Sequence, residues 1–591
     1  MSGETPPSKP VFFRFTGHND IFNETKNYLS QLDTSDTEFE GTSVDGSQSN
    51  NGIRFQDLPP IIRQTSLAVL ECVFGPYYDH LISRGTKNEN KLWADLHVPV
   101  ILKSLEATFG SRLDRRTINL ERIAEVICNN TARPLQDIHT SSQAWLDQLC
   151  SPNLRWESIA LLWSVLRRVP NALDPIEQHQ LNGTEYGTPG GETMLSFLRH
   201  SISLARHFTL GNVILLNLHR QKTVIESMIV GDASLTCWNS HAETVAMMTY
   251  LGVHAQKGIG PYKPSMCSEY KRRLFVQTHN LDKAVVAFTG RPPLLNPRYC
   301  TTPQPLDLSD EDLIAGGAAL ERAVASLDPR GWNTQGGVYP STICRGGYLM
   351  APILNEIFEI VLVAESNATV ETLRRLKQRE MDAAAQIPTS LIYNPDDLSN
   401  PDLETNVLSM RILLRLTHLQ NVFLLERLLL QYGALDEGDV LVVSFEMVAL
   451  TLLFWKHKDR FHDARRDFEW LVGLKTEWLL MAFAVPGGGI LCLELLRPTF
   501  QARHPKDSRL SRSSIVQQLS LLVGFLDWVH ISAPNGDLCA SCKTVIQRVL
   551  DYHLNNPMNN AGSLEDFSSG LAGRLNFRFE LLNTFEWLNT R

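Results

Sequence analysis

The stretch TNVLSMRILLRLTHLQNVFLLERLLLQYG, residues 405–433, decides the fold class. Its apolar residues recur three and four positions apart, which is the spacing of one face of a helix. The residues on that face are Leu408, Ile412, Leu419 and Phe423. Gly433 ends the run, and glycine is the usual residue just past a helix because it adopts left-handed backbone angles without a Cβ clash. This stretch therefore predicts one long helix.

The same period recurs outward along the chain, while strand-like alternation is scarce. Segments with the helical period include RQTSLAVLECVFGPYYDHLI (63–82), NLERIAEVICNN (119–130), WESIALLWSVLRRVP (156–170) and SFLRHSISLARHFTL (196–210). Low-order stretches near 172–192, 327–340, 387–404 and 502–513 read as loops between helical blocks. The pattern predicts an all-α protein of many helices joined by Pro-, Gly- and polar-rich loops.

Two regions differ in composition. Residues 1–54 hold the small, polar patch GTSVDGSQSNNG, which predicts a largely disordered linker. The folded body is predicted to begin at DLPP, 57–60, where proline suits a first helical turn and Asp57 or a neighbour can cap the helix. We expect the all-α domain to cover residues 55–590.

Length and charge limit the function classes. A chain of 591 residues is too long for one hydrophobic core. With 55 basic and 64 acidic side chains the net charge is −9, which gives no general attraction to nucleic acid or anionic membrane. The most apolar stretch, 440–455, is too short for a membrane span and carries Glu446, so we expect a buried core helix and no membrane partner.

The ten cysteines are too sparse for a disulfide framework. The first residues, MSGETPPSKP, are polar and Pro-rich, unlike a signal peptide. These features predict a reducing compartment, cytosol or nucleus, with free buried thiols.

A helix is predicted to stop inside LDKAVVAFTGRPPLLNPRYC, residues 281–300. Gly290 suits a helix end, while Pro292 and Pro293 push their predecessors out of the helical region. We expect the extended continuation to pack back across the helices.

A series of motifs surrounds this break. In chain order they are GDAS (231–234) with Trp238 on a helix, LGVH (251–254), Lys271-Arg272-Arg273 with Phe275, Asp282-Lys283, Gly290-Arg291-Pro292-Pro293, Tyr299-Cys300 and PLDLSDEDL (305–313). Their order and spacing over residues 204–313 resemble the middle homology region of fungal transcription factors of the binuclear zinc-cluster type, the xylanolytic-activator-like regulatory domain. Weaker likeness extends to NLRWESIALLW (153–163) and to FRFELLNTFEWL (577–588).

The resemblance implies a nuclear, all-α regulatory body that controls RNA polymerase II transcription. Family members hold two zinc ions with six clustered cysteines near the N-terminus, but no cysteine precedes Cys72 here. DNA contact is therefore expected only through a zinc cluster missing from this chain or carried by a partner, and the chain itself is expected to hold no cofactor or metal. Homo- or heterodimers with related factors and a small-molecule inducer are further implied partners. The alternative is a stand-alone interaction protein that pairs with a full-length relative.

Seven residues form the candidate regulatory motif: Arg272, Arg273, Asp282, Gly290, Arg291, Pro292 and Pro293. One interpretation is an ion-pair network, with Asp282 and Arg291 as partners, that fixes the proline segment against the helix. The other is a solvated face with one structural pair, since exposed ion pairs contribute little to stability. The basic run 271–273 is expected to face solvent rather than DNA.

No catalytic pattern accompanies these motifs. The chain lacks HExxH, a Walker loop and G-x-S-x-G, so we expect no enzyme. Cys539 and Cys542 have neither a second cysteine pair nor nearby histidines, which favours two thiols at a helix start over a zinc or redox site. Glu311 and Asp312 suit the acidic first turn of a helix.

Overall fold

The computed structural model describes ten stretches of the chain. They are residues 52–74, 97–109, 120–165, 191–256, 262–363, 367–435, 437–461, 476–500, 504–531 and 533–555. Within them lie 19 α-helices and no β-strand, only one isolated bridge between Leu327 and Asn333. The all-α prediction is confirmed.

The first half of the chain supplies nine of these helices. They are α2 (Pro60–Val73), α4 (His97–Phe109), α5 (Leu120–Ala132), α6 (Ser142–Asp147), α7 (Trp156–Val165), α9 (Gly191–Phe208), α10 (Val213–Val230), α11 (Leu235–Tyr250) and α12 (Met266–Thr289). The second half supplies the rest. They are α13 (Asp310–Ala315), α14 (Gly317–Ala325), α15 (Pro340–Val361), α16 (Val370–Ala384), α17 (Thr405–Gln431), α18 (Asp439–Lys456), α20 (Thr476–Leu479), α21 (Val485–Leu496), α22 (Arg512–Asp527) and α23 (Gly536–Asn555).

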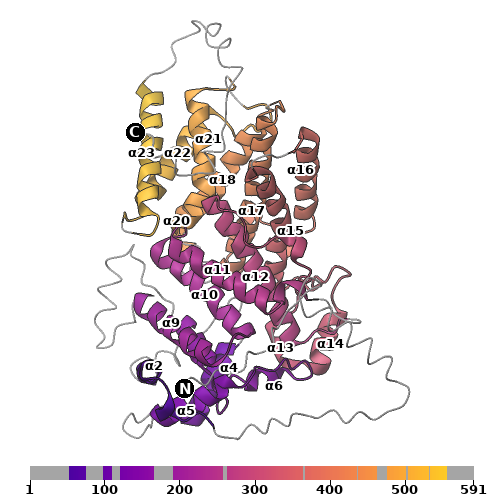
Figure 1. The fold of residues 1–591 in the computed structure, drawn as a ribbon. Coiled ribbons are helices and arrows are strands. Elements are labelled where there is room, and N and C mark those ends of the chain that lie inside the picture. The colour runs from indigo at the N-terminus through magenta and orange to yellow at the C-terminus, as the bar shows by residue number, and fades with distance from the viewer. Residues whose placement is uncertain are drawn as a thin grey trace.

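Within the described stretches, buried apolar side chains form three large cores and a small fourth one. The first core is built mainly by α2 to α12, the second by α15 to α18, and the third by α18 to α23. Figure 1 shows α2, α4 and α5 at one end, α21 to α23 at the other, and α10 to α12 between them. Several cores, rather than one, are what a chain of this length requires.

Helix α12 contacts all three large cores. Tyr270 and Phe275 belong to the first, Val286 to the second and Phe288 to the third. The helix therefore connects the two ends of the molecule through its own packing.

Both ends of α12 are fixed by local chemistry. Ser265 accepts from the backbone N–H of Ser268, and Ser268 accepts from the backbone N–H of Ser265, which is a capping box. Gly290 ends the helix with a φ of 67°, the left-handed region that glycine enters at little cost. The predicted helix stop at Gly290 is confirmed.

Several local predictions need correction. GDAS does not lie on a helix but joins two: Gly231 ends α10, and Ser234 caps α11. Asp57 makes no cap for α2, whose N-cap position is Pro59, whereas the predicted proline in the first helical turn is confirmed by Pro60. Residues 52–54 are docked on α5, where Asn129 bonds both backbone groups of Ile53. Residues 1–51 and the closing segment 577–588 lie outside the described residues.

The PGGG sequence at 486–489 does not break the apolar run. The chain continues as one helix from α20 through the π-helical turn η6 (Leu480–Ala484) into α21. A π turn directly before Pro486 offers a place for a residue that cannot donate a helix hydrogen bond. Gly487 lets α21 approach α18 closely, because a Cβ added at this position would lie only 2.7 Å from the carbonyl oxygen of Ser444.

One helix among the described residues, Glu477–Leu496, is long and apolar enough to cross a membrane. Of the 18 most apolar consecutive residues in this helix, 72% are buried inside the protein, as is usual for a core helix. The stretch 440–455 lies within α18, whose apolar residues also pack into the second and third cores.

Candidate functional site

Two of the three residues in the basic run on α12 are buried rather than solvent-facing, which corrects the sequence expectation. Arg272 and Arg273 are 9% and 6% exposed. The guanidinium of Arg272 lies 3.4 Å from the ring centroid of Tyr262, and its Nη1 donates to the carbonyl of Gln304 at 3.3 Å. This arrangement stacks the first turns of α12 against the segment that leads into residues 305–313.

Arg273 joins α12 to the PLDLSDEDL segment, residues 305–313. Its Nη1 pairs with Asp310 in the first turn of α13, and its Nη2 donates to the carbonyl of Leu308 at 3.0 Å. Asp307 in the same segment is buried and accepts from Thr342 at 2.5 Å at the start of α15. The acidic first turn predicted around Glu311 is confirmed by α13.

Asp282 organises the C-terminal half of α12. Its carboxylate accepts from Nε2–H of His241 on α11 at 2.8 Å and from Nζ of Lys283 at 2.8 Å. It also accepts from the backbone N–H groups of Leu294 at 3.1 Å and Leu295 at 3.3 Å. Lys283 in turn donates to the carbonyl of Leu295 at 2.6 Å. We call residues 290–300 the GRPP segment. The carboxylate of Asp282 thus holds α11, α12 and the GRPP segment in contact.

Neither Asp282 nor His241 is exposed, and Lys283 is 1% exposed. Burial opposes ionisation of Asp282, but the hydrogen bond from His241 and the charge of Lys283 outweigh it, so the pKa of Asp282 is lowered. Burial lowers the pKa of Lys283, and the neighbouring Asp282 opposes that shift. The ionised carboxylate is the form that this arrangement stabilises.

Arg291 does not pair with Asp282, which corrects the partner considered from the sequence. Its Nη2 donates to the carbonyl of Ala233 at 2.8 Å, and its guanidinium lies 5.2 Å from the ring centroid of Trp238. Arg291 therefore attaches the GRPP segment to the GDAS turn and α11, while Asp282 attaches it to α12. Leu295 is buried in the first core, so the expected packing of this segment against the helices is observed.

The seven predicted residues fall into two groups, one near each end of α12. Arg272 and Arg273 lie near its N-terminal end, and Asp282 with the residues 290–293 lies at its C-terminal end. From Arg273 to Asp282 the helix axis advances about 13 Å, so the groups do not touch directly. They share α12 rather than one cluster of side chains.

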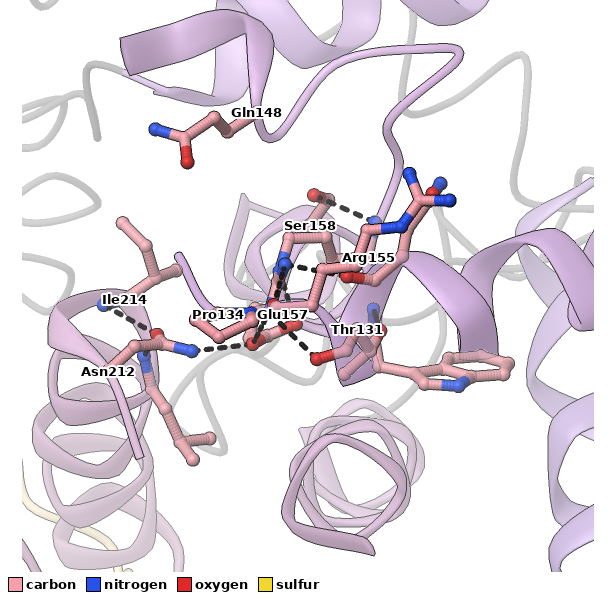
Figure 2. Close-up of polar contacts among 12 residues, drawn as sticks. Thr131, Pro134, Gln148, Arg155, Glu157, Ser158, Asn212 and Ile214 are labelled. Carbon is pink, nitrogen blue, oxygen red and sulfur yellow. Dashed lines mark hydrogen bonds and ion pairs between the residues drawn. The ribbon is translucent and has the colours of Figure 1, made fainter. Parts of the chain in front are cut away.

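A second buried network, which the sequence reading did not single out, lies in the first core (Figure 2). Arg155, 3% exposed, donates to the carbonyls of Asn130 at 2.7 Å and Thr131 at 2.9 Å at the end of α5. It also bonds Glu157, which is fully buried. An arginine here satisfies carbonyls that a helix end leaves without partners.

Glu157 extends this network to α10. Its carboxylate accepts from Nδ2 of Asn212 at 2.7 Å, and the Oδ1 of Asn212 caps the N–H groups of Ile214 and Leu215 (Figure 2). The residues RWES in the stretch 153–163 thus connect the end of one helix to the start of another. The only sequence signal was an Arg and a Glu two residues apart in an apolar run.

The His241–Asp282 pair has the geometry by which a carboxylate orients a catalytic histidine. Within the described part of the chain, however, Nδ1 of His241 has no hydrogen-bond partner, so no hydroxyl or thiol nucleophile completes a triad. Both side chains are buried away from solvent. This arrangement can hold α11, α12 and the GRPP segment packed against one another.

The two thiols of α23 behave as core groups. Cys539 and Cys542 are 0% and 1% exposed and belong to the third core. Burial raises the pKa of both thiols, that of Cys542 to about 12. The interpretation of two thiols on the first turns of a helix agrees with these positions.

One group of metal-ligand side chains was not apparent from sequence spacing. Asp137, His139 and Cys267 each place one ligand atom within 4.8 Å of the others. Two come from the loop after α5 and one from the first turn of α12, 128 residues further along the chain than His139. Spacing along the sequence therefore gave no signal for it.

Comparisons with known proteins identify no relative. No protein-family model matches the chain, and no curated protein and no solved structure matches it.

Proposed function

We propose that this chain is the regulatory body of a fungal transcription regulator of the zinc-cluster type, acting in the nucleus on RNA polymerase II transcription. One observation carries the proposal: the ordered motifs between residues 204 and 313 resemble the middle homology region of that family. Their packing supports it. The basic run and Asp282 lie on α12. The PLDLSDEDL and GRPP segments bond residues of that helix, and the GDAS turn bonds Arg291 of the GRPP segment.

The mechanism in this proposal is a shift between two packings of the domain. Asp282 and Arg291 hold the GRPP segment on α12 and α11. Because α12 contacts all three large cores, a change at this segment reaches both ends of the molecule. A signal that favours the released segment would shift the population toward the open packing. Whether the signal activates transcription or releases it from restraint depends on which of the two packings recruits the transcription machinery.

DNA contact in this proposal runs through a binuclear zinc cluster outside these 591 residues. The cluster lies either on another segment of the same protein or on a related partner that pairs with this chain. Cysteines near the start of the chain are too few to form one, since the first is Cys72. The net charge of −9 is consistent with a body that does not bind DNA by itself.

A tethering experiment tests the proposal. The chain is fused to a heterologous DNA-binding module, and transcription of a reporter carrying that module's site is measured in a fungal cell. The control is the same module fused to an unrelated helical protein of similar size and equal abundance. A several-fold change in reporter transcription supports the proposal, and output equal to the control contradicts it.

A further inference from the structure

We propose that Asp137, His139 and Cys267 form a zinc-binding site at the N-terminal end of α12. The three side chains offer a carboxylate oxygen, a ring nitrogen and a sulfur, which are the three ligand types that Zn²⁺ takes in proteins. The inference does not rest on the proposed function. It also departs from the sequence expectation that the chain holds no metal.

One separation in the group matches that between two ligands of a tetrahedral zinc ion. The Sγ of Cys267 lies 3.4 Å from Oδ1 of Asp137. Ligand atoms about 2.0–2.3 Å from a tetrahedral zinc ion stand roughly 3.3–3.7 Å apart. The three ligand atoms lie within 4.8 Å of one another, so the group has to contract on binding, and the exposed side chains of Asp137 and His139 can move to do so.

Neighbouring side chains already hold the ligands in position. Ser265, the N-cap of α12, bonds Nδ1 of His139 at 2.9 Å. Lys271 pairs with Oδ2 of Asp137, which leaves Oδ1 facing Cys267. Hydrogen bonds of this kind orient metal ligands and fix which atom faces the ion. The ammonium of Lys271 opposes a second positive charge, so we expect binding weaker than in a closed four-ligand site.

The burial of the group gives the ion one route of entry. Cys267 is fully buried in the first core, whereas Asp137 and His139 are exposed. Zinc reaches the sulfur from the loop side. On binding, the ion replaces the S–H proton that Cys267 now donates to Asp137, and the proton leaves to solvent. Three protein ligands leave a fourth position for water.

Zinc at this site would connect the loop 133–141 to the first turn of α12. Without the ion, the loop reaches α12 through the hydrogen bonds of Ser265, Cys267 and Lys271. The ion would therefore add metal–ligand bonds between this loop and α12, the helix that contacts all three large cores. We expect zinc to raise the melting temperature of the chain.

Cobalt spectroscopy on the full chain tests the site. Metal-free protein is titrated with Co²⁺ alone, and the sulfur-to-cobalt charge-transfer band is followed. The band is expected to saturate at one equivalent in the wild type, to be lost in Cys267→Ser, and to persist in Cys72→Ser. A wild type without the band, or a Cys267→Ser protein that keeps it, overturns the proposal.

A second variant, His139→Gln, tests the site independently, because Cys267→Ser changes a buried residue and can lose the fold. His139 is exposed, so His139→Gln is expected to leave the circular dichroism of the metal-free protein unchanged. Its Zn²⁺ affinity, measured by competition with a chromophoric chelator, is expected to fall by at least about 10-fold. The matched control His457→Gln changes another exposed histidine and should bind zinc like the wild type. Equal affinity in all three proteins contradicts the site.

Discussion

Asp282 accepts a hydrogen bond of 2.8 Å from Nε2 of His241 at a place where neither side chain is exposed to solvent. The same carboxylate accepts from Lys283 and from two backbone N–H groups of the GRPP segment. One buried charge thus joins two helices and the extended segment that follows α12. Four donors on one carboxylate make the ionised form favourable despite burial.

Asp282→Asn is expected to lower the free energy of unfolding by about 3–5 kcal/mol. The change removes the charge that compensates the buried Lys283 and weakens the attachment of Leu294 and Leu295. Denaturant unfolding measures it, with Asp402→Asn as the control because that carboxylate is exposed. A difference between the two variants below 1 kcal/mol would contradict the role assigned to Asp282.

Arg291→Ala is expected to destabilise the protein by about 1–2 kcal/mol, less than the change at Asp282. It removes a charged donor to the carbonyl of Ala233 and a contact with the ring of Trp238. The melting temperature of Arg298→Ala serves as the comparison, because Arg298 lies in the same segment with its side chain 77% exposed. An unchanged melting temperature in Arg291→Ala counts against this prediction.

His279→Phe is expected to reduce the loss of stability at acidic pH. Burial, reinforced by the charge of Lys283, lowers the pKa of His279 from 6.5 to about 3, and Asp282 opposes this shift. The unfolded chain binds a proton below pH 6.5 while the folded one does not, so stability falls as the pH drops from 6.5 toward 3. Between pH 7.5 and 5.5 this residue accounts for about 1.4 kcal/mol.

The measurement is urea unfolding at both pH values. Neither ring nitrogen of His279 has a hydrogen-bond partner among the described residues, and its ring packs on Phe275 and Tyr348, so phenylalanine fits chemically. The exposed His457→Phe variant is the control and should keep the wild-type pH dependence. A His279→Phe protein with an unaltered pH dependence would show that the histidine is not buried in its neutral form.

Two glycines in one helix should respond in opposite directions to alanine. Gly487→Ala is expected to destabilise the protein by roughly 1–3 kcal/mol, because the added Cβ meets the backbone of Ser444 at 2.7 Å. Gly489→Ala meets nothing within 4 Å and should stabilise the helix by up to about 1 kcal/mol. Thermal unfolding of both variants decides it. Equal shifts would mean that α21 and α18 are not in close contact.

The sequence predicted the helical class, and the reason is visible in α17. Its apolar residues recur at the helical spacing, and Gly433 follows the helix with a φ of 87°. It also predicted the stop at Gly290, since glycine followed by an arginine and two prolines leaves few alternatives. Local backbone chemistry determines such features.

The partners of the buried charges were not predictable in the same way. The burial of Arg272 and Arg273 depends on Gln304, Leu308 and Asp310, which lie more than 30 residues further along the chain. From the local sequence, a three-residue basic run is predicted to face solvent, because the segment that covers it lies further along the chain. The close approach of α18 that Gly487 permits is likewise a tertiary contact, which the local sequence does not predict.

The Arg155–Glu157 network and the Asp137–His139–Cys267 group were missed for a related reason. Each combines side chains from elements separated by dozens of residues, such as Glu157 with Asn212. No spacing rule for a single motif covers such pairs.

Regulation through the Asp282 attachment is tested most directly by comparing tethered wild type with tethered Asp282→Asn on the same reporter. Both fusions are matched for abundance, and Asp402→Asn is the control. The wild type is expected to alter transcription relative to the module alone, and Asp282→Asn is expected to shift this output several-fold, while Asp402→Asn is expected to leave it unchanged. Output from Asp282→Asn equal to the wild type, or a wild type equal to the module alone, would contradict regulation through the Asp282 attachment.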